Sequence, residues 1–290
     1  VTQVLVNPDG ALSGTAVGHL LLQYDFESLG ALSGAGNAGL GPVSGWNQEK
    51  IGHRFGRLCT EQGLQYTLIG DVEHGVSTSA QMGPQPDGKI LDVLQQLEDL
   101  DGGLLCENPA LFGLEYRARA DMVAQPPALI ADYSLAQVSP PFQPVEDDQL
   151  TRNIVTVSRV NGSSVTVRDV TSPMSALDPP DGVGEYAYSL TVNAFADSQL
   201  AGVAARILTQ GTVDEYRYPQ VSFQLARPSV RELMGQLTQL GDGDRVRVLS
   251  PPGFLGVGTI DLLALGFTMT ITSATVAITL NCVPESPFES

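Results

Sequence analysis

Charge is scarce in this sequence, and lysine is almost absent. Charged residues make up 16% of the 290 residues, compared with about a quarter in an average soluble domain. Lysine occurs only at Lys50 and Lys89, and acidic residues outnumber basic ones by 32 to 15, which gives a formal net charge of −17. This sign disfavours binding to free nucleic acid and to anionic membranes, because both repel a negative surface.

The low charge and its sign each leave two interpretations open. A largely neutral surface suits a protein that is buried in an assembly, but a surface of Gly- and Ser-rich loops would have the same composition. The excess of carboxylates would let DNA slide through a channel without being gripped, an effect that reaches about 8 Å in physiological salt. The same excess would also simply favour solubility.

Paired cysteines, membrane-spanning runs and a leader pattern are also missing. Cys59, Cys106 and Cys282 lie far apart without a CxxC pair, so the sequence predicts no disulfide framework. No apolar run reaches the roughly 18 residues that a membrane span needs, and the N-terminus lacks the pattern of a signal peptide. The chain begins at Val1 rather than at methionine, which fits a processed product, a tag-free fragment or the end of a longer polypeptide.

The first of three predicted regions, residues 1–47, is a Gly-rich extended arm or loop. Its candidate strands are Val4–Val6 and Leu20–Phe26, and glycine, serine and alanine dominate between Gly30 and Gly45. Ordering so much glycine costs conformational entropy. We therefore expect this region to be either a flexible arm or a loop that neighbouring structure orders.

The second region, residues 48–135, is predicted to be a small α+β domain. Apolar residues recur at helical spacing from Ile51 to Cys59 and again from Ile90 to Leu100, which predicts two helices. Glycines at 63 and 102–103 are expected to end them. The predicted strands are 65–69, 104–107 and 111–118, of which the last two would form a hairpin.

The third region, residues 136–290, is predicted to be a barrel-like or sandwich-like β-domain with two helices. Asn161-Gly162 is a strong hairpin signal, because both residues tolerate positive φ. The helices are expected from Leu200 to Leu208, capped by Asp197 or Ser198, and from Ser229 to Leu240. The predicted strands contain residues 155–157, 165–167, 186–192, 221–225, 246–248, 267–271 and 276–280. The expected fold class is therefore α+β and β-rich.

Two look-alikes of phosphate-binding motifs fail in their details. Residues 83–90 match GxxxxGK, but two prolines remove backbone donors, Asp87 adds the wrong charge, and Ile90 lacks the hydroxyl that would hold magnesium. Residues 34–39 match GxGxxG, but no strand clearly precedes them and no helix clearly follows. We expect neither segment to bind a nucleotide.

The histidines and the acidic pairs form no convincing catalytic or metal-binding pattern. His19, His53 and His74 include no HExxH pair, and His74 beside Glu73 is better explained by a solvated loop than by a metal site. There is no GxSxG elbow for a hydrolytic triad. Asp147/Asp148 and Asp214/Glu215 could suggest glycoside hydrolysis, but neighbouring acids on a strand point to opposite faces, so these pairs are better explained as turn or surface acids. Asp242 and Asp244 flank Gly243, but the EF-hand pattern is incomplete. We expect no catalytic, cofactor-binding or metal-binding residues.

Several segments resemble minor tail proteins of long-tailed phages that infect actinobacteria. The segments are EDDQLTRNIVTVSR (146–159), DPPDGVGEYAYSLTVN (178–193), DSQL (197–200) and GTVDEYRYPQV (211–221). Weaker likeness extends the match to roughly residues 55–288, through FGRLCTEQGLQYTLIGD, AQMGPQPDGKILDVLQQLEDLDGGLLCE, GLEYRARA and the closing GFTMTITSATVAITLNCVPESPF.

The resemblance implies a tail-tip or baseplate hub protein. Such hubs form rings at the distal end of the tail tube, are commonly threefold, and join the sixfold tube to a fibre or spike. For this chain the resemblance implies a non-enzymatic virion protein of the tail tip. It is expected to contact copies of itself, as a trimer, and other tail-tip and tail-tube proteins, while genomic DNA passes without specific binding. Related proteins are often longer. The alternatives are a tail-associated carbohydrate-active or cell-wall-degrading enzyme and a receptor-binding module.

Overall fold

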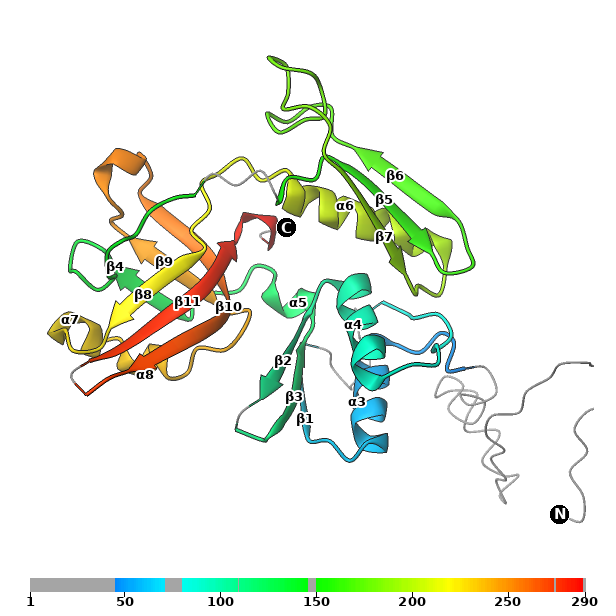
Figure 1. The fold of residues 1–290 in the computed structure, drawn as a ribbon, viewed down its shortest axis with the longest axis horizontal. Coiled ribbons are helices and arrows are strands. Elements are labelled where there is room, and N and C mark those ends of the chain that lie inside the picture. The colour runs from blue at the N-terminus through cyan, green and yellow to red at the C-terminus, as the bar shows by residue number, and fades with distance from the viewer. Residues whose placement is uncertain (1–44, 71–79, 109, 146–149, 274, 289–290) are drawn as a thin grey trace, which may run out of the picture.

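Three β-sheets and the helices packed on them make up the described part of the molecule (Figure 1). The structure is a computed structural model that describes residues 45–70, 80–108, 110–145, 150–273 and 275–288. The candidate strands Val4–Val6 and Leu20–Phe26 and the GxGxxG segment at 34–39 lie outside these ranges. The mixed, strand-rich composition confirms the predicted fold class.

The first sheet carries two helices, as predicted. Its strands follow the order β1-β3-β2, with β1 parallel and β2 antiparallel to the central β3. The apolar stripes place α3 and α4 against it, and Gly102 ends α4 in the left-handed conformation at φ 76°. The bounds are α3 Ile51–Glu61, β1 Tyr66–Ile69, α4 Ile90–Asp101, β2 Leu104–Asn108 and β3 Gly113–Arg117, followed by the short helix α5 Arg119–Met122.

The second sheet has the order β6-β5-β7 and is covered by helix α6. Asn161 adopts φ 56° in the turn between β5 and β6, which confirms the predicted hairpin. The predicted cap of α6 is wrong: Asp197 begins the 3₁₀ turn η3, and its carboxylate accepts hydrogen bonds from Arg159 and Ser163 instead. The bounds are β5 Ile154–Arg159, β6 Ser164–Arg168, β7 Ala187–Val192, η3 Asp197–Gln199 and α6 Leu200–Gly211.

The third sheet has five strands in the order β4-β9-β10-β11-β8. The single helix predicted over 229–240 is instead two four-residue helices separated by a turn at Glu232 and Leu233, where the Leu233 N–H donates to the Val230 carbonyl, three residues back, at 3.0 Å. Thr238 then donates its hydroxyl to the Met234 carbonyl. The bounds are β4 Leu129–Asp132, β8 Gln220–Gln224, α7 Pro228–Arg231, α8 Met234–Leu237, β9 Arg245–Leu249, β10 Thr259–Ile271 and β11 Val276–Pro284, with 3₁₀ turns η4 Gly253–Leu255 and η5 Ser286–Phe288.

A β-bulge divides β10 into two halves. Ala264 lies opposite Cys282 and Gly266 lies opposite Asn281, so Leu265 is an extra residue without a partner across the ladder. The extra residue changes the phase of the side chains. Before the bulge, Leu262 and Ala264 point into the core below the five-stranded sheet, and after it the odd-numbered residues from Phe267 onward share that face.

Two large cores and a small one hold the sheets together. The first core joins α3, α4 and the first sheet to the second sheet and α6. The second lies under the five-stranded sheet and includes the stacked rings of Phe142 and Tyr218. The third consists of Met122, Leu263 and Phe288 and lies on the opposite face of β10. The proposed boundaries at residues 47 and 135 stay predictions.

Arg117 links the first sheet to the five-stranded sheet. Its side chain begins on β3 and is nearly buried. The guanidinium donates to Asp121 at 2.7 Å, to the Asp242 carbonyl at 2.9 Å and to the Asp244 carboxylate at 2.7 Å. The last two partners lie immediately before β9. One buried cation therefore fixes the approach of β9 to β3.

Candidate functional site

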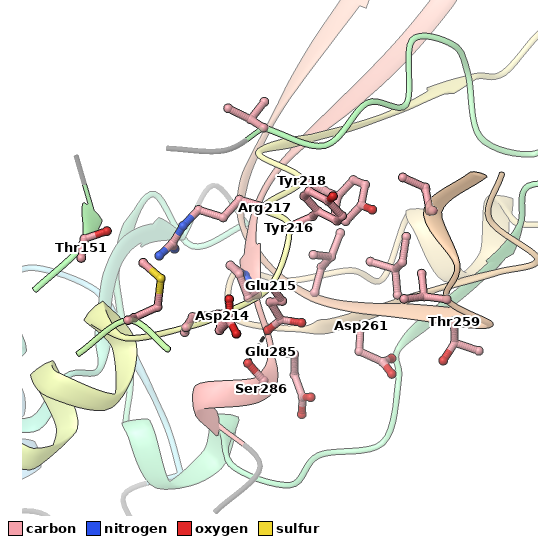
Figure 2. A pocket seen from close by; sticks show the side chains of 18 residues that line it. Thr151, Asp214, Glu215, Tyr216, Arg217, Tyr218, Thr259, Asp261, Glu285 and Ser286 are labelled. Atoms are coloured by element: carbon pink, nitrogen blue, oxygen red, sulfur yellow. Dashed lines mark hydrogen bonds between the residues drawn. The ribbon is translucent and has the colours of Figure 1, made fainter. Parts of the chain in front are cut away.

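A cavity of about 1070 Å³ lies beside the five-stranded sheet in the described part of the chain. It lies where the connection from α6 to β8 passes the start of β10 and the end of β11 (Figure 2). Four carboxylates line it, and they come from three separate segments of the chain: Asp214, Glu215, Asp261 and Glu285. Sequence reasoning did not find this cavity, because no local spacing relates those segments.

Asp261 is held as an ion by two arginines of the neighbouring strand. The antiparallel register places Arg247 directly opposite Asp261, and its guanidinium donates to both carboxylate oxygens at 2.8 and 3.0 Å. Arg245 approaches the same carboxylate at 3.3 Å. Burial alone would raise the pKa of Asp261, but the hydrogen bonds from Arg247 and Arg245 outweigh it and lower that pKa.

Glu285 is the most deeply buried acid of the cavity, with its side chain 1% exposed. Its carboxylate lies 3.2 Å from the Arg245 guanidinium, and its backbone N–H donates to the Asp261 carbonyl at 3.3 Å. Arg245 therefore contacts both the half-buried Asp261 and the buried Glu285.

Asp214 and Glu215 approach the cavity from the connection between α6 and β8. They lie in irregular structure on the surface, which confirms the prediction that this pair consists of turn or surface acids. Both residues are exposed, and Ser286 donates its hydroxyl to Glu215. Figure 2 shows Asp214, Glu215 and Glu285 clustered near Ser286.

Tyrosines form another wall of the cavity. The ring of Tyr218 stacks on Phe142 with centroids 4.8 Å apart, and burial raises its pKa, with smaller contributions from Tyr216 and Glu215. Tyr216 stays exposed beside it. Carboxylates beside aromatic faces favour contact with cations over contact with anions, so the cavity is unsuited to phosphate.

In the segment that matches GxxxxGK, the backbone groups at its start form hydrogen bonds with neighbouring parts of the chain. The Gly83 carbonyl accepts from the buried Arg54 at 2.8 Å, and the Gly83 N–H donates to the Asn193 carbonyl at 2.9 Å. Asn193 also donates to the Pro84 carbonyl at 2.9 Å. The backbone groups at the start of this loop are therefore unavailable to cradle phosphate, and Ile90 begins α4.

The other polar candidates are dispersed. His53 is exposed on α3, while His19, His74 and the Asp147/Asp148 pair lie outside the described residues. Asp244 accepts from Arg117, as described above. Within the described ranges, no group of three or more His, Cys, Asp or Glu side chains is arranged to hold a metal ion. No helix in those ranges is long and apolar enough to cross a membrane.

A second surface feature is the uncharged strand formed by the distal half of β10. No charged residue occurs from Leu262 to Pro284, although the chain as a whole carries many acids. Phe267, Met269 and Ile271 are 56%, 47% and 70% exposed. Exposed apolar strands of this kind are typical of contacts with another polypeptide.

Comparison with known proteins yields a likeness of fold. No family model and no curated protein matches the chain. The 43 kDa tail protein of prophage MuSo2 from Shewanella oneidensis has 13% sequence identity and a TM-score of 0.51, covering 84% of this chain and 66% of that protein. The tail protein from Neisseria meningitidis MC58 has 11% identity and a TM-score of 0.57, covering 83% of this chain and 69% of that protein. The chain thus spans about two thirds of their length and shares their fold.

Proposed function

We propose that this chain is a structural protein of a phage tail, placed in the tail tip or baseplate hub, where copies of it form a ring around the DNA channel. The observation that carries the proposal is the fold shared with two tail proteins across more than four fifths of the chain. The ring would connect the tail tube to a distal fibre or spike. The actinobacterial host is part of the same proposal and rests on the sequence resemblance.

Two physical features support assembly into a ring. The uncharged strand of β10 leaves an apolar surface that a neighbouring copy would cover. The net charge of −17 would keep passing DNA from adhering to the protein. Neither feature requires bond chemistry.

The position in the particle is tested by cryo-electron microscopy of the virion that encodes the chain. The expected result is density for several copies, with threefold symmetry, around the channel at the distal end of the tail. Sedimentation of the purified chain is the companion measurement, and we expect an oligomer or a complex with a tail partner. Absence from the virion would contradict the proposal.

The enzymatic alternative is tested separately at the acid-lined cavity. Asp214 and Glu215 are its exposed carboxylates, so Asp214→Asn and Glu215→Gln are the informative variants. We expect no turnover on purified host cell wall with the unmodified chain. Turnover that either variant abolishes would favour the enzyme over the structural role.

A further inference from the structure

The distal half of β10 has a free hydrogen-bonding edge in the described structure. From Gly266 to Ile271 the strand pairs with β11 on one side. On the other side, β9 pairs only with residues 259–263 of β10. Among the described residues, no loop or turn makes a backbone hydrogen bond to 266–271. The edge also lacks the charged residues, prolines and bulges that usually protect such an edge beyond Gly266.

The apolar side chains along this edge continue the face of a buried core. Phe267 lies opposite Leu280 and Met269 lies opposite Ile278 in the ladder, and directly opposed residues share one face of a sheet. Leu280 and Ile278 are buried in the second core. The core face therefore extends past the structure that covers it. One more strand along the edge, with its apolar side on this face, would cover the exposed rings and methyl groups.

The sequence contains a segment whose pattern fits the edge. In Leu20–Phe26, which reads LLLQYDF, every second residue is apolar, namely Leu20, Leu22, Tyr24 and Phe26. In a strand, Gln23 and Asp25 would lie on the face opposite these apolar residues. The distal half of β10 alternates in the same way, with threonines between its apolar residues. Paired strands place both apolar sets on one face and both polar sets on the other.

We propose that Leu20–Phe26 of one copy adds as a strand to the free edge of β10 in another copy. The donor is a second copy because the proposed function requires contacts between copies, and α3, which begins shortly after the first described residues, lies in a part of the molecule away from its own β10 (Figure 1). The chain between Phe26 and Gly45 can span at most about 65 Å when fully extended. Each copy then gives one strand and receives one, a head-to-tail contact that forms a ring when the rotation between successive copies closes.

The distribution of charge also favours the pairing of Leu20–Phe26 with β10 of another copy. Copies with a net charge of −17 repel one another over most of their surface. The distal half of β10 carries no charge, and the one acid within the donor segment, Asp25, would lie beside threonines on the polar face. The pairing therefore brings two copies together where their repulsion is weakest. This inference rests on the self-association in the proposed function and names the segment that makes the contact.

Disulfide trapping between full-length chains tests the pairing. One chain carries Gln23→Cys, and a second chain carries Thr268→Cys or Thr270→Cys, so that a new link joins two copies. Facing residues of paired strands lie within the roughly 7 Å between Cα atoms that a disulfide requires. The matched control is a second chain with Thr209→Cys, an exposed position on α6. Chains without added cysteines give the background of disulfide-linked dimers that form through Cys59, Cys106 and Cys282.

We expect linked dimers with the β10 cysteines to exceed those with the α6 cysteine several-fold. Adding Tyr24→Asn to the Gln23→Cys chain should reduce the linkage, whereas Asp25→Asn, which changes the neighbouring residue on the opposite face, should leave it unchanged. Circular dichroism checks that all variants stay folded.

The outcomes separate this inference from the proposed function. If sedimentation shows an oligomer but the β10 cysteines link no better than the α6 cysteine, the strand pairing is wrong and self-association stands. If the chain is a monomer at high concentration, forms no links and binds no tail partner, both are wrong. If a chain carrying Gln23→Cys and Thr268→Cys links only within itself, independently of concentration, the donor is the same copy and the exchange is overturned.

Discussion

The two halves of β10 belong to one strand but have opposite surroundings. The proximal half, from Thr259 to Ala264, pairs with β9 through Thr259–Leu263 and with β11 from Leu262 onward, is mostly buried, and carries Asp261 in its pairing with Arg247. The distal half, from Gly266 to Ile271, is paired on one side, is largely exposed and has no charge. The two halves are similarly apolar in sequence, with four and three apolar residues of six. The comparison teaches that neighbouring strands, rather than composition, decide which apolar residues become core.

The comparison is tested most strongly by removing an apolar side chain from each half. Leu262 is 1% exposed in the second core, so Leu262→Ala should lower the free energy of unfolding by about 2–5 kcal/mol, as truncations in tight cores do. Phe267→Ala should change it by less than about 1 kcal/mol in the isolated chain, because surface substitutions have small effects. Urea unfolding measures both. Equal losses would mean that the distal half is already covered.

Removing the charge of Asp261 in the proximal half should give the next largest loss of unfolding free energy. Asp261→Asn removes the carboxylate that accepts from Arg247 and Arg245, leaving two half-buried guanidiniums less well satisfied. We expect a loss of about 1–2 kcal/mol, smaller than the 3–5 kcal/mol for a fully buried pair, because part of the site is open to solvent. Asp87→Asn, in an exposed loop, is the control and should be neutral.

The same aspartate predicts a pH dependence with a definite sign. Its pKa is lowered in the folded chain, so its contribution to stability is complete above the unfolded pKa of about 3.9 and is lost as the pH falls through the folded value. The difference in unfolding free energy between the unmodified chain and Asp261→Asn should therefore shrink below about pH 4. A difference that stays constant down to pH 2.5 or so would contradict the pairing.

A charge placed in the distal half should leave stability nearly unchanged and act on assembly. Met269→Lys puts an ammonium group on the exposed apolar face of the free edge, which is how natural edge strands avoid pairing. We expect the melting temperature of the isolated chain to stay within a few degrees, while sedimentation shifts toward the monomer. Thr209→Lys on α6 controls for the added charge. An unchanged oligomer would place the contact between copies elsewhere.

Local patterns in the sequence predicted most of the elements. The stripes around Ile51 and Ile90 gave helices at the expected positions, and Asn161-Gly162 gave the expected turn. The errors occurred where tertiary partners compete with a local preference. Asp197 left its role as a cap because Arg159 and Ser163 hold its carboxylate, and the helix expected from Ser229 breaks at Leu233, which packs into the second core.

The cavity and the sheet order could not be predicted in this way. Asp261 meets Arg245 and Arg247 because two strands pair in a particular register, and that register is set by long-range packing. The alternation of arginines in RVRV followed by a lone aspartate on the next strand was the available signal. Likewise, no periodicity indicated that β4 would join β9, since the two strands are more than a hundred residues apart.

The extra residue at Leu265 has a consequence for tracing the ancestry of this strand. In this chain Phe267, which faces the second core opposite Leu280, comes three residues after Ala264. In a relative without the extra residue, the position on that face would come two residues after the counterpart of Ala264, so its apolar pattern would be shifted by one place along the sequence. Alignments of distant homologues should therefore allow a one-residue gap here, because an ungapped alignment would equate positions that lie on opposite sides of the sheet.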